Sequence, residues 1–127
     1  MPKEPPLILL VDDEADVLSV YKRKLELSGF NVITATNGAE AVQQAAIEEP
    51  DLILMDMKMP IMNGLEAWQK IRENPLTKNI KVIFLTAFGD PLEPEIDEHL
   101  AKEIGAKDFI RKGIDLDELV SRVKKSL

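Results

Sequence analysis

Short apolar runs alternate along the chain with longer stretches in which apolar residues recur every three or four positions. The most apolar runs occupy residues 7–11, 52–55 and 80–85; residues 30–35 are rich in residues that favour strands, and 107–110 is expected to form a further short strand. Runs that are apolar throughout predict strands buried on both faces, as in a parallel sheet covered by helices on each side.

The intervening stretches predict helices. Their apolar positions at helical spacing are Val17, Val20, Tyr21 and Leu25 within 14–28; Val42, Ala45 and Ala46 after Asn37-Gly38; Leu65, Trp68 and Ile71; and Leu116, Leu119, Val120 and Val123 within 115–126. Another helix is expected from near Pro94 to just before Gly105. Gly29 predicts the end of the first helix, and Pro50 that of the second. The pattern predicts an α/β fold, a doubly wound (βα)5 three-layer sandwich with a five-stranded parallel sheet.

The length and composition fit a single domain. The chain has 127 residues, of which 45% are hydrophobic, enough to build one core over residues 7–127. Residues 1–6 contain three prolines and are expected to form a flexible lead-in. Cysteine is absent and there is one histidine, which leaves no material for disulfides, thiolate metal sites or histidine-rich metal sites.

Charge and hydropathy exclude several partners. A formal net charge of −7 argues against a nucleic-acid surface, which needs a basic stripe. No apolar run is long enough to span a bilayer, and the first residues lack the apolar core of a signal peptide. We therefore expect a cytoplasmic domain with neither nucleic acid nor membrane among its partners.

Polar residues gather where the predicted strands end. Asp12 and Asp13 follow the first strand, Asp56 the third, Thr86 the fourth and Lys112 the fifth. Ligands of open parallel sheets bind outside the carboxyl ends of the strands, where the strand order reverses. If the first and third strands are neighbours, the three carboxylates converge in one crevice.

Three converging carboxylates predict a bound cation. Their mutual repulsion is relieved by raised pKa values or by a metal ion among them. Oxygen ligands without thiolates or imidazoles favour Mg²⁺. We expect Asp12, Asp13 and Asp56 to hold it, with the backbone carbonyl of Lys58 as a further ligand.

The remaining polar residues suggest phosphoryl chemistry. Lys112 would pair with an anion and Thr86 would donate a hydroxyl, so that with the metal they would surround a phosphoryl group. An aspartate carboxylate can itself be the nucleophile that accepts this group. Asp56 is the candidate, because it stands alone and centrally, whereas Asp12 and Asp13 are adjacent, as metal-ligand pairs are.

Four motifs resemble one family. LLVDDE at 9–14, LILMDMKMPIMNG at 52–64, FLTA at 84–87 and GAKDFIRKG at 105–113 occur in order and at suitable spacing. Together they resemble the response-regulator receiver domain of two-component signalling, over about residues 7–126. The resemblance implies the strand order 2-1-3-4-5.

The resemblance also implies a role for each matching residue: Asp56 as phospho-acceptor, Asp12 and Asp13 as the Mg²⁺ pair, Lys112 as the phosphoryl contact, Thr86 as the switch hydroxyl and Phe109 as the aromatic that turns inward on activation. The expected donor is a histidine kinase or a phosphotransfer protein carrying phosphohistidine. A downstream partner of unknown identity would bind the face of the fourth helix, fifth strand and fifth helix. Such a domain is not an enzyme, apart from its own phosphorylation and dephosphorylation.

The sequence departs from the family in two places. The family usually has proline, often in a cis bond, after the lysine, and this chain has Gly113. The segment 88–97 makes the chain about one helical turn longer than is common between Thr86 and Gly105. These departures concern the geometry around Lys112 and the choice of partner.

Other functions and simpler interpretations stay open. A Mg²⁺-dependent phosphatase with an aspartyl nucleophile would usually need a second carboxylate two residues past Asp56, where this chain has Lys58. A flavodoxin-like cofactor binder would need a phosphate-binding loop in place of the acidic DDEAD at 12–16. The simpler interpretations are helix-capping acids for Asp12 and Asp13, a strand end for Asp56 and Thr86, a solvated loop residue for Lys112 and core packing for Phe109.

Overall fold

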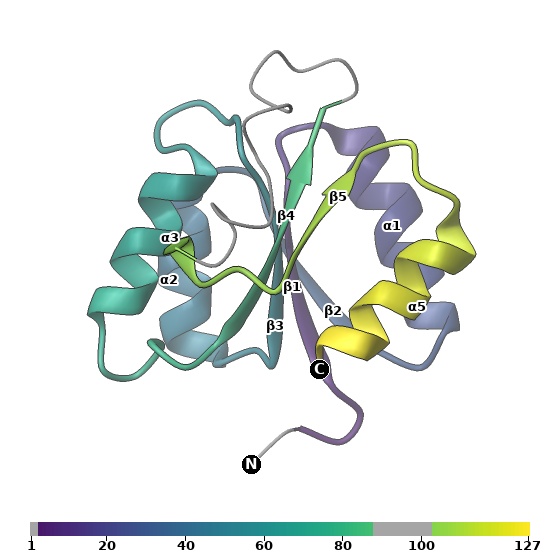
Figure 1. Ribbon diagram of the computed structural model, residues 1–127, viewed down its shortest axis with the longest axis horizontal. Helices are drawn as coiled ribbons and strands as arrows, with labels where there is room; N and C mark the ends of the chain where they lie inside the picture. The colour runs from purple at the N-terminus through teal and green to yellow at the C-terminus, as the bar shows by residue number, and fades with distance from the viewer. Residues whose placement is uncertain (1–2, 88–102) are drawn as a thin grey trace.

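A five-stranded parallel sheet forms the centre of the molecule in the computed structural model, which describes residues 3–87 and 103–127 (Figure 1). The strands are β1 (Leu7–Val11), β2 (Asn31–Ala35), β3 (Leu52–Asp56), β4 (Lys81–Thr86) and β5 (Asp108–Arg111). They lie in the order β2-β1-β3-β4-β5, and all neighbouring pairs are parallel. The predicted α/β fold and strand order are confirmed.

Helices cover both faces of the sheet. They are α1 (Ala15–Leu27), α2 (Gly38–Glu48), α3 (Gly64–Glu73) and α5 (Leu116–Ser126). Figure 1 shows α1 and α5 on one face and α2 and α3 on the other. The helix predicted from Pro94 and the longer segment 88–97 fall largely or wholly outside the described residues, although Glu103 and Ile104, just before Gly105, are helical.

Apolar burial explains why the strands take central positions. Every residue of β1 and β3 is buried, and alternate residues of each strand face opposite helix layers. Leu10 and Leu54 pack in the cluster beneath α1 and α5. Val11 and Met55 pack in the cluster beneath α2 and α3. The two core layers therefore fix β3 from both sides and, with it, the position of Asp56 at its end.

Local signals define the helix ends. Asn37 caps α2, and Asn63 forms a capping box with Glu66 at the start of α3. Gly29 follows the last turn of α1 with a φ of +98°, which confirms it as the residue that ends this helix. Helix α2 stops at Glu48, two residues before the proline that predicted its end.

Several predicted details need correction. Asp56 and Thr86 are the last residues of β3 and β4 rather than residues that follow them, because main-chain pairing continues regardless of side-chain polarity. Val20 is 48% exposed and Leu65 is 39% exposed, although both were predicted on apolar faces. Val20 lies about 100° around α1 from its buried neighbour Tyr21, so it points past the edge of the buried stripe.

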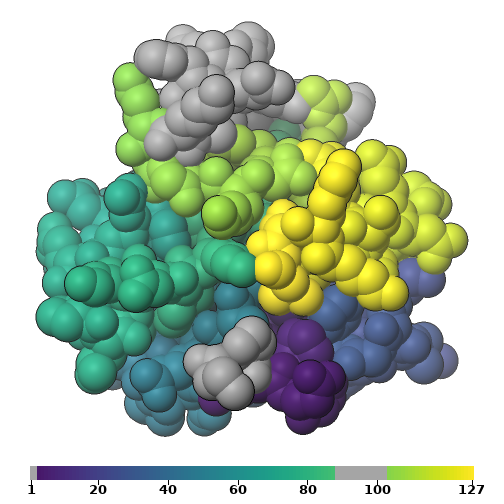
Figure 2. Space-filling view, turned by 60° about the horizontal axis from the view of Figure 1, so that its bottom comes forward, coloured from purple at the N-terminus to yellow at the C-terminus, as the bar shows by residue number. Residues whose placement is uncertain are grey.

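The amino-terminal edge of the sheet lies opposite the predicted site. There the backbone N–H groups of Lys3 and Leu7 donate to the Asp51 carboxylate, and Lys81 Nζ donates to the carbonyl of Leu127 at 2.6 Å. Figure 2 shows this edge, with the first described residues (purple) beside the end of α5 (yellow). Flexibility of the lead-in stays a prediction. Within the described ranges, no helix combines the length and the apolarity that crossing a membrane requires.

Candidate functional site

The five polar residues singled out in the sequence meet at the carboxyl edge of the sheet. Asp12 and Asp13 directly follow β1, Asp56 ends β3, Thr86 ends β4 and Lys112 directly follows β5. Because β1 pairs with β3 and β3 with β4, the ends of these strands lie side by side. The fold therefore brings together residues up to a hundred positions apart.

Three carboxylates form the centre of the site. One carboxylate oxygen from each of Asp12, Asp13 and Asp56 lies within 4.8 Å of the others, which is close enough to share one metal ion. Asp12 is 0% exposed and Asp56 is 3% exposed, whereas Asp13 is exposed. Asp12 is also held by its neighbours, since its Oδ1 accepts the N–H of Glu14 at 2.9 Å.

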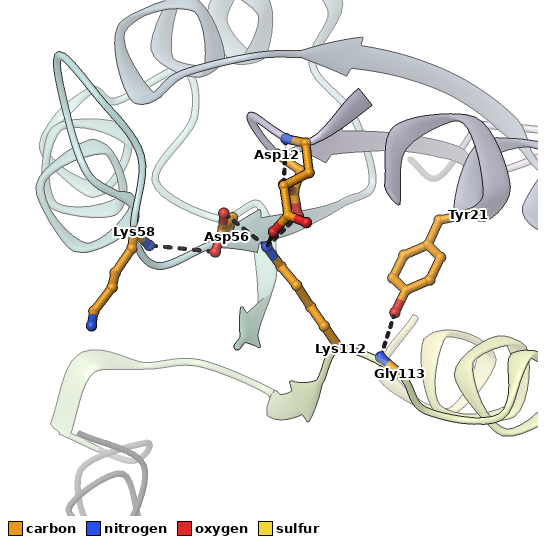
Figure 3. Close-up of polar contacts among 7 residues, drawn as sticks. Asp12, Tyr21, Asp56, Lys58, Lys112 and Gly113 are labelled. Atoms are coloured by element: carbon orange, nitrogen blue, oxygen red, sulfur yellow. Dashed lines mark hydrogen bonds and ion pairs between the residues drawn. The ribbon is translucent and has the colours of Figure 1, made fainter. Parts of the chain in front are cut away.

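The ammonium group of Lys112 lies among the carboxylates (Figure 3). Its Nζ is 2.8 Å from Asp12 Oδ2, 2.9 Å from Glu14 Oε1 and 3.0 Å from Asp56 Oδ2. The side chains of Lys112, Asp12 and Asp56 are at most 10% exposed, so their pairs are only weakly screened by solvent, whereas the Glu14 side chain is 60% exposed. One ammonium group thus faces three carboxylates, so these four side chains carry a net negative charge. Asp13 adds a further carboxylate to it.

Burial and charge shift the pKa values in the site. Burial, with the nearby charge of Asp12, raises the pKa of Asp56 from 3.8 to about 6, against the lowering effect of Lys112. Burial likewise raises the pKa of Asp12. Burial acts to lower the pKa of Lys112, but its close contacts with the carboxylates of Asp12, Glu14 and Asp56 outweigh this effect and raise it.

Asp12 Oδ2 can accept a further ligand. It is buried and lies 2.8 Å from Lys112 Nζ, yet the geometry is that of an ion pair and this oxygen has no hydrogen bond within the described residues. A buried carboxylate oxygen in this state favours an additional cationic ligand. The donor set of the site therefore fits a hard divalent ion such as Mg²⁺.

The residues predicted to act as a switch lie on β4 and β5. Thr86 is buried, and its carbonyl accepts the backbone N–H of Lys112 at 2.8 Å. Phe109 is half-buried, and its ring stacks on that of Phe84 with centroids 5.5 Å apart. Phe84 and Thr86 point to the same face of the sheet, so Phe109 and Thr86 belong to one continuous stretch of that face.

The loop after β3 approaches Asp56 closely. The backbone N–H of Lys58 donates to Asp56 Oδ1 at 3.4 Å, and Gly64 N–H donates to the carbonyl of Met57 at 3.0 Å. A Cβ on Gly64 would lie 2.2 Å from the Asp56 carbonyl oxygen, so only glycine fits there. The role of the Lys58 carbonyl as a metal ligand stays a prediction.

Sequence reasoning missed two contacts of the site. Glu14 directly follows the acidic pair, but its pairing with Lys112 depends on the position of β5 and carries no sequence signal. Tyr21 was assigned to the helix face, yet its hydroxyl accepts the N–H of Gly113 at 3.4 Å. Both contacts join α1 and its preceding loop to the segment after β5.

Comparison with known families identifies the family to which the chain belongs. The sequence profile of the response regulator receiver domain matches residues 8–124. The chain belongs to this family. As a receiver domain of two-component response regulators, it is a regulatory module rather than an enzyme.

Curated relatives and solved structures agree with this family. The alkaline phosphatase synthesis transcriptional regulatory protein PhoP of Bacillus subtilis is 38% identical over 120 residues, which cover 94% of this chain and 48% of that protein. The chain spans about half the length of the curated relatives it matches.

Two solved structures have the same fold. A response regulator from Chloroflexus aurantiacus aligns with a TM-score of 0.83 and 33% identity, over 98% of this chain and 97% of that one. The receiver domain of a sensor histidine kinase from Pseudomonas aeruginosa, described with a magnesium ion in its active-site cleft, has a TM-score of 0.83 and 27% identity. That alignment covers 95% of this chain and 96% of that one.

Proposed function

We propose that this receiver domain accepts a phosphoryl group on Asp56 from a phosphohistidine, and that the modification alters the surface it presents to a partner. The observation that carries the proposal is the 3.0 Å contact between Asp56 Oδ2 and Lys112 Nζ, beside the carboxylates of Asp12 and Asp13. A nucleophile, a cation and a metal-binding pair thus share one small site.

Asp56 has the properties of the nucleophile. With a pKa of about 6 it is mostly ionised at neutral pH, and burial keeps its oxygen poorly hydrated. One Asp56 oxygen would bond to phosphorus as the phosphorus–nitrogen bond of phosphohistidine breaks, and the imidazole would leave with the electron pair of that bond. Lys112 would stabilise the charge on the phosphoryl oxygens.

Mg²⁺ is the cofactor that the donor set fits. Asp12, Asp13, Asp56 and the backbone carbonyl of Lys58 would hold the ion. When bound, it would neutralise the charge that the carboxylates and an incoming phosphoryl group bring together. Asp12 would then share with the ion part of the charge that it now shares with Lys112, and Lys112 would turn from Asp12 toward the phosphoryl group.

The proposed switch consists of Thr86 and Phe109. A phosphoryl group on Asp56 would attract the Thr86 hydroxyl, and Phe109 would turn inward beside it, reshaping the face of the predicted fourth helix, β5 and α5. The donor would be a histidine kinase or a phosphotransfer protein, and an unidentified downstream protein would bind the altered face. We propose that this takes place in the cytoplasm, without nucleic acid or membrane contacts by this domain.

The test is phosphorylation by acetyl phosphate with MgCl2, followed by intact-protein mass spectrometry and by acid and hydroxylamine lability of the product. The wild-type chain should gain one phosphoryl group, and Asp56→Asn should gain none. Asp51→Asn is the matched control, because it changes the same residue type directly before β3, at the opposite edge of the sheet from Asp56. Persistent labelling of Asp56→Asn at the wild-type rate would contradict the assignment.

A further inference from the structure

The turn that follows β5 orients Lys112. Ile114 N–H donates to the carbonyl of Arg111 at 3.2 Å, which closes a four-residue turn with Lys112 and Gly113 at its centre. Gly113 has a φ of +91°, the value that a type II turn requires at its third position. A Cβ there would meet nothing within 4 Å, so glycine is needed for its backbone angle rather than for space.

Gly113 offers a donor that a proline at this position would lack. Its N–H points to the hydroxyl of Tyr21, and the distance between nitrogen and oxygen is 3.4 Å (Figure 3). Tyr21 belongs to α1 and is 5% exposed, with its ring packed in the core beneath α1 and α5. The acceptor is therefore attached to a fixed part of the molecule.

The peptide groups on both sides of Lys112 are thus tied to different elements. The N–H of Lys112 donates to the Thr86 carbonyl at 2.8 Å, and this bond holds the chain to β4. The contact between Gly113 and Tyr21 holds the next peptide to α1. Burial raises the pKa of the Tyr21 phenol, and the charges of Lys112 and Asp12 also act on it, which agrees with a hydroxyl close to the site.

We propose that Tyr21 is a positioning residue for Lys112: its hydroxyl holds the Gly113 peptide and thereby the turn that directs the lysine ammonium to Asp56. The effect on phosphorylation rests on the function proposed above, whereas the effect on the turn does not. Because the hydrogen bond is long and neutral, its loss should slow phosphorylation of Asp56 about two- to fivefold.

Tyr21→Phe tests this directly, because it removes the hydroxyl and keeps the ring. Thr77→Val is the matched control: Thr77 is also buried, and its hydroxyl donates to the Ile71 carbonyl at 2.6 Å, far from the site at the other edge of the sheet. Gly113→Ala tests the turn from its other side, since the positive φ strains any residue with a Cβ. Each variant is compared with wild type in urea denaturation, initial rate with acetyl phosphate and NMR spectra.

The expected results separate positioning from general stability. Tyr21→Phe should move the Gly113 amide proton to lower frequency, shift the Lys112 Hε–Cε signals and slow labelling, and Gly113→Ala should also slow labelling. Thr77→Val should lower the urea midpoint but leave the labelling rate and the Gly113 and Lys112 signals unchanged. Unchanged Gly113 and Lys112 signals in Tyr21→Phe, or a wild-type labelling rate with those signals shifted, would overturn the proposal.

The experiments distinguish a failure of the proposed function from a failure of the proposed role of Tyr21. If the wild-type chain takes no label on Asp56, phosphorylation by this route is refuted. The NMR comparison still decides whether Tyr21 holds the turn and the Lys112 side chain, because those signals are measured without a phosphodonor.

Discussion

At the scale of single residues, the site depends on an imbalance of charge around Asp56. Burial and the Asp12 carboxylate disfavour its ionised form, and Lys112 favours it, but the first two effects are larger. Lys112 is itself shared among Asp12, Glu14 and Asp56, so it offers each only part of its charge. Keeping an ionised, poorly hydrated carboxylate at this position therefore lowers the stability of the folded protein.

This imbalance predicts that Asp56→Asn is more stable than wild type, with a pH-dependent difference. The folded-state pKa of about 6 lies above the ordinary 3.8, so ionising Asp56 costs about 3 kcal/mol more in the folded state. Well below pH 3.8 both states are protonated and the penalty is absent; it builds up between about pH 4 and 6, where only the unfolded state is largely ionised, and stays constant above that range. In EDTA, the variant should gain about 1–3 kcal/mol at pH 8 and little at pH 4.

Urea denaturation at pH 4, 6 and 8 measures this difference. Glu26→Gln, which changes an exposed carboxylate on α1, serves as the control and should stay near wild type at every pH. A stabilisation of Asp56→Asn that is the same at all three values would show that charge is not its cause.

At the scale of elements, the connection between β3 and α3 keeps Asp56 in place. Asn63 caps α3, whose first residue, Gly64, lies against the Asp56 carbonyl. The loop therefore packs onto the end of the strand that carries the acceptor. Any added volume at Gly64 must displace either the loop or the carbonyl of Asp56.

Gly64→Ala should disturb both stability and the site. Its Cβ would lie 2.2 Å from the Asp56 carbonyl oxygen and 3.0 Å from the Met55 side chain. We expect a loss of about 1–3 kcal/mol in the free energy of unfolding and slower phosphorylation by acetyl phosphate. Gly29→Ala, where φ is +98° but space is open, should cost about 1 kcal/mol and leave the phosphorylation rate unchanged. Equal labelling of Gly64→Ala and wild type would show that the loop adapts without moving Asp56.

At the scale of the whole molecule, the site exists only in the folded chain. Its residues come from the ends of β1, β3, β4 and β5, and the two core layers hold these strands in register. The unfolded chain has no such cluster of carboxylates. An ion that binds the cluster therefore binds the folded state and stabilises it by mass action.

Mg²⁺ should accordingly raise the unfolding temperature, by an amount that grows with the logarithm of its concentration once this exceeds the dissociation constant. At ten times the dissociation constant the gain is about 1.4 kcal/mol, which corresponds to a few degrees for a domain of this size. Differential scanning calorimetry with increasing MgCl2 at constant ionic strength measures the shift. Asp13→Asn should reduce it, whereas Glu48→Gln, an exposed change on α2, should not. A shift that is identical in Asp13→Asn and wild type would count against this ligand set.

The sequence by itself determined the elements and the kinds of residue at their ends. The apolar runs of β1, β3 and β4 predict buried parallel strands, because only a sheet covered on both faces can bury every residue. Caps such as Asn37 and stops such as Gly29 predict helix ends, because the backbone angles and hydrogen bonds involved are local. The motifs around Asp12, Asp56 and Lys112 carried the family resemblance, and they can be recognised from the sequence alone.

Only the tertiary structure decided which groups touch. The three carboxylates around Lys112, including Glu14, meet because strands distant in sequence pair in one register. The exposure of Val20 and Leu65 depends on how far the buried stripe of each helix extends over the sheet. The contact between Tyr21 and Gly113 joins residues 92 positions apart. Such contacts are set by how the layers pack against each other, and a periodicity within one element contains no information about its neighbour.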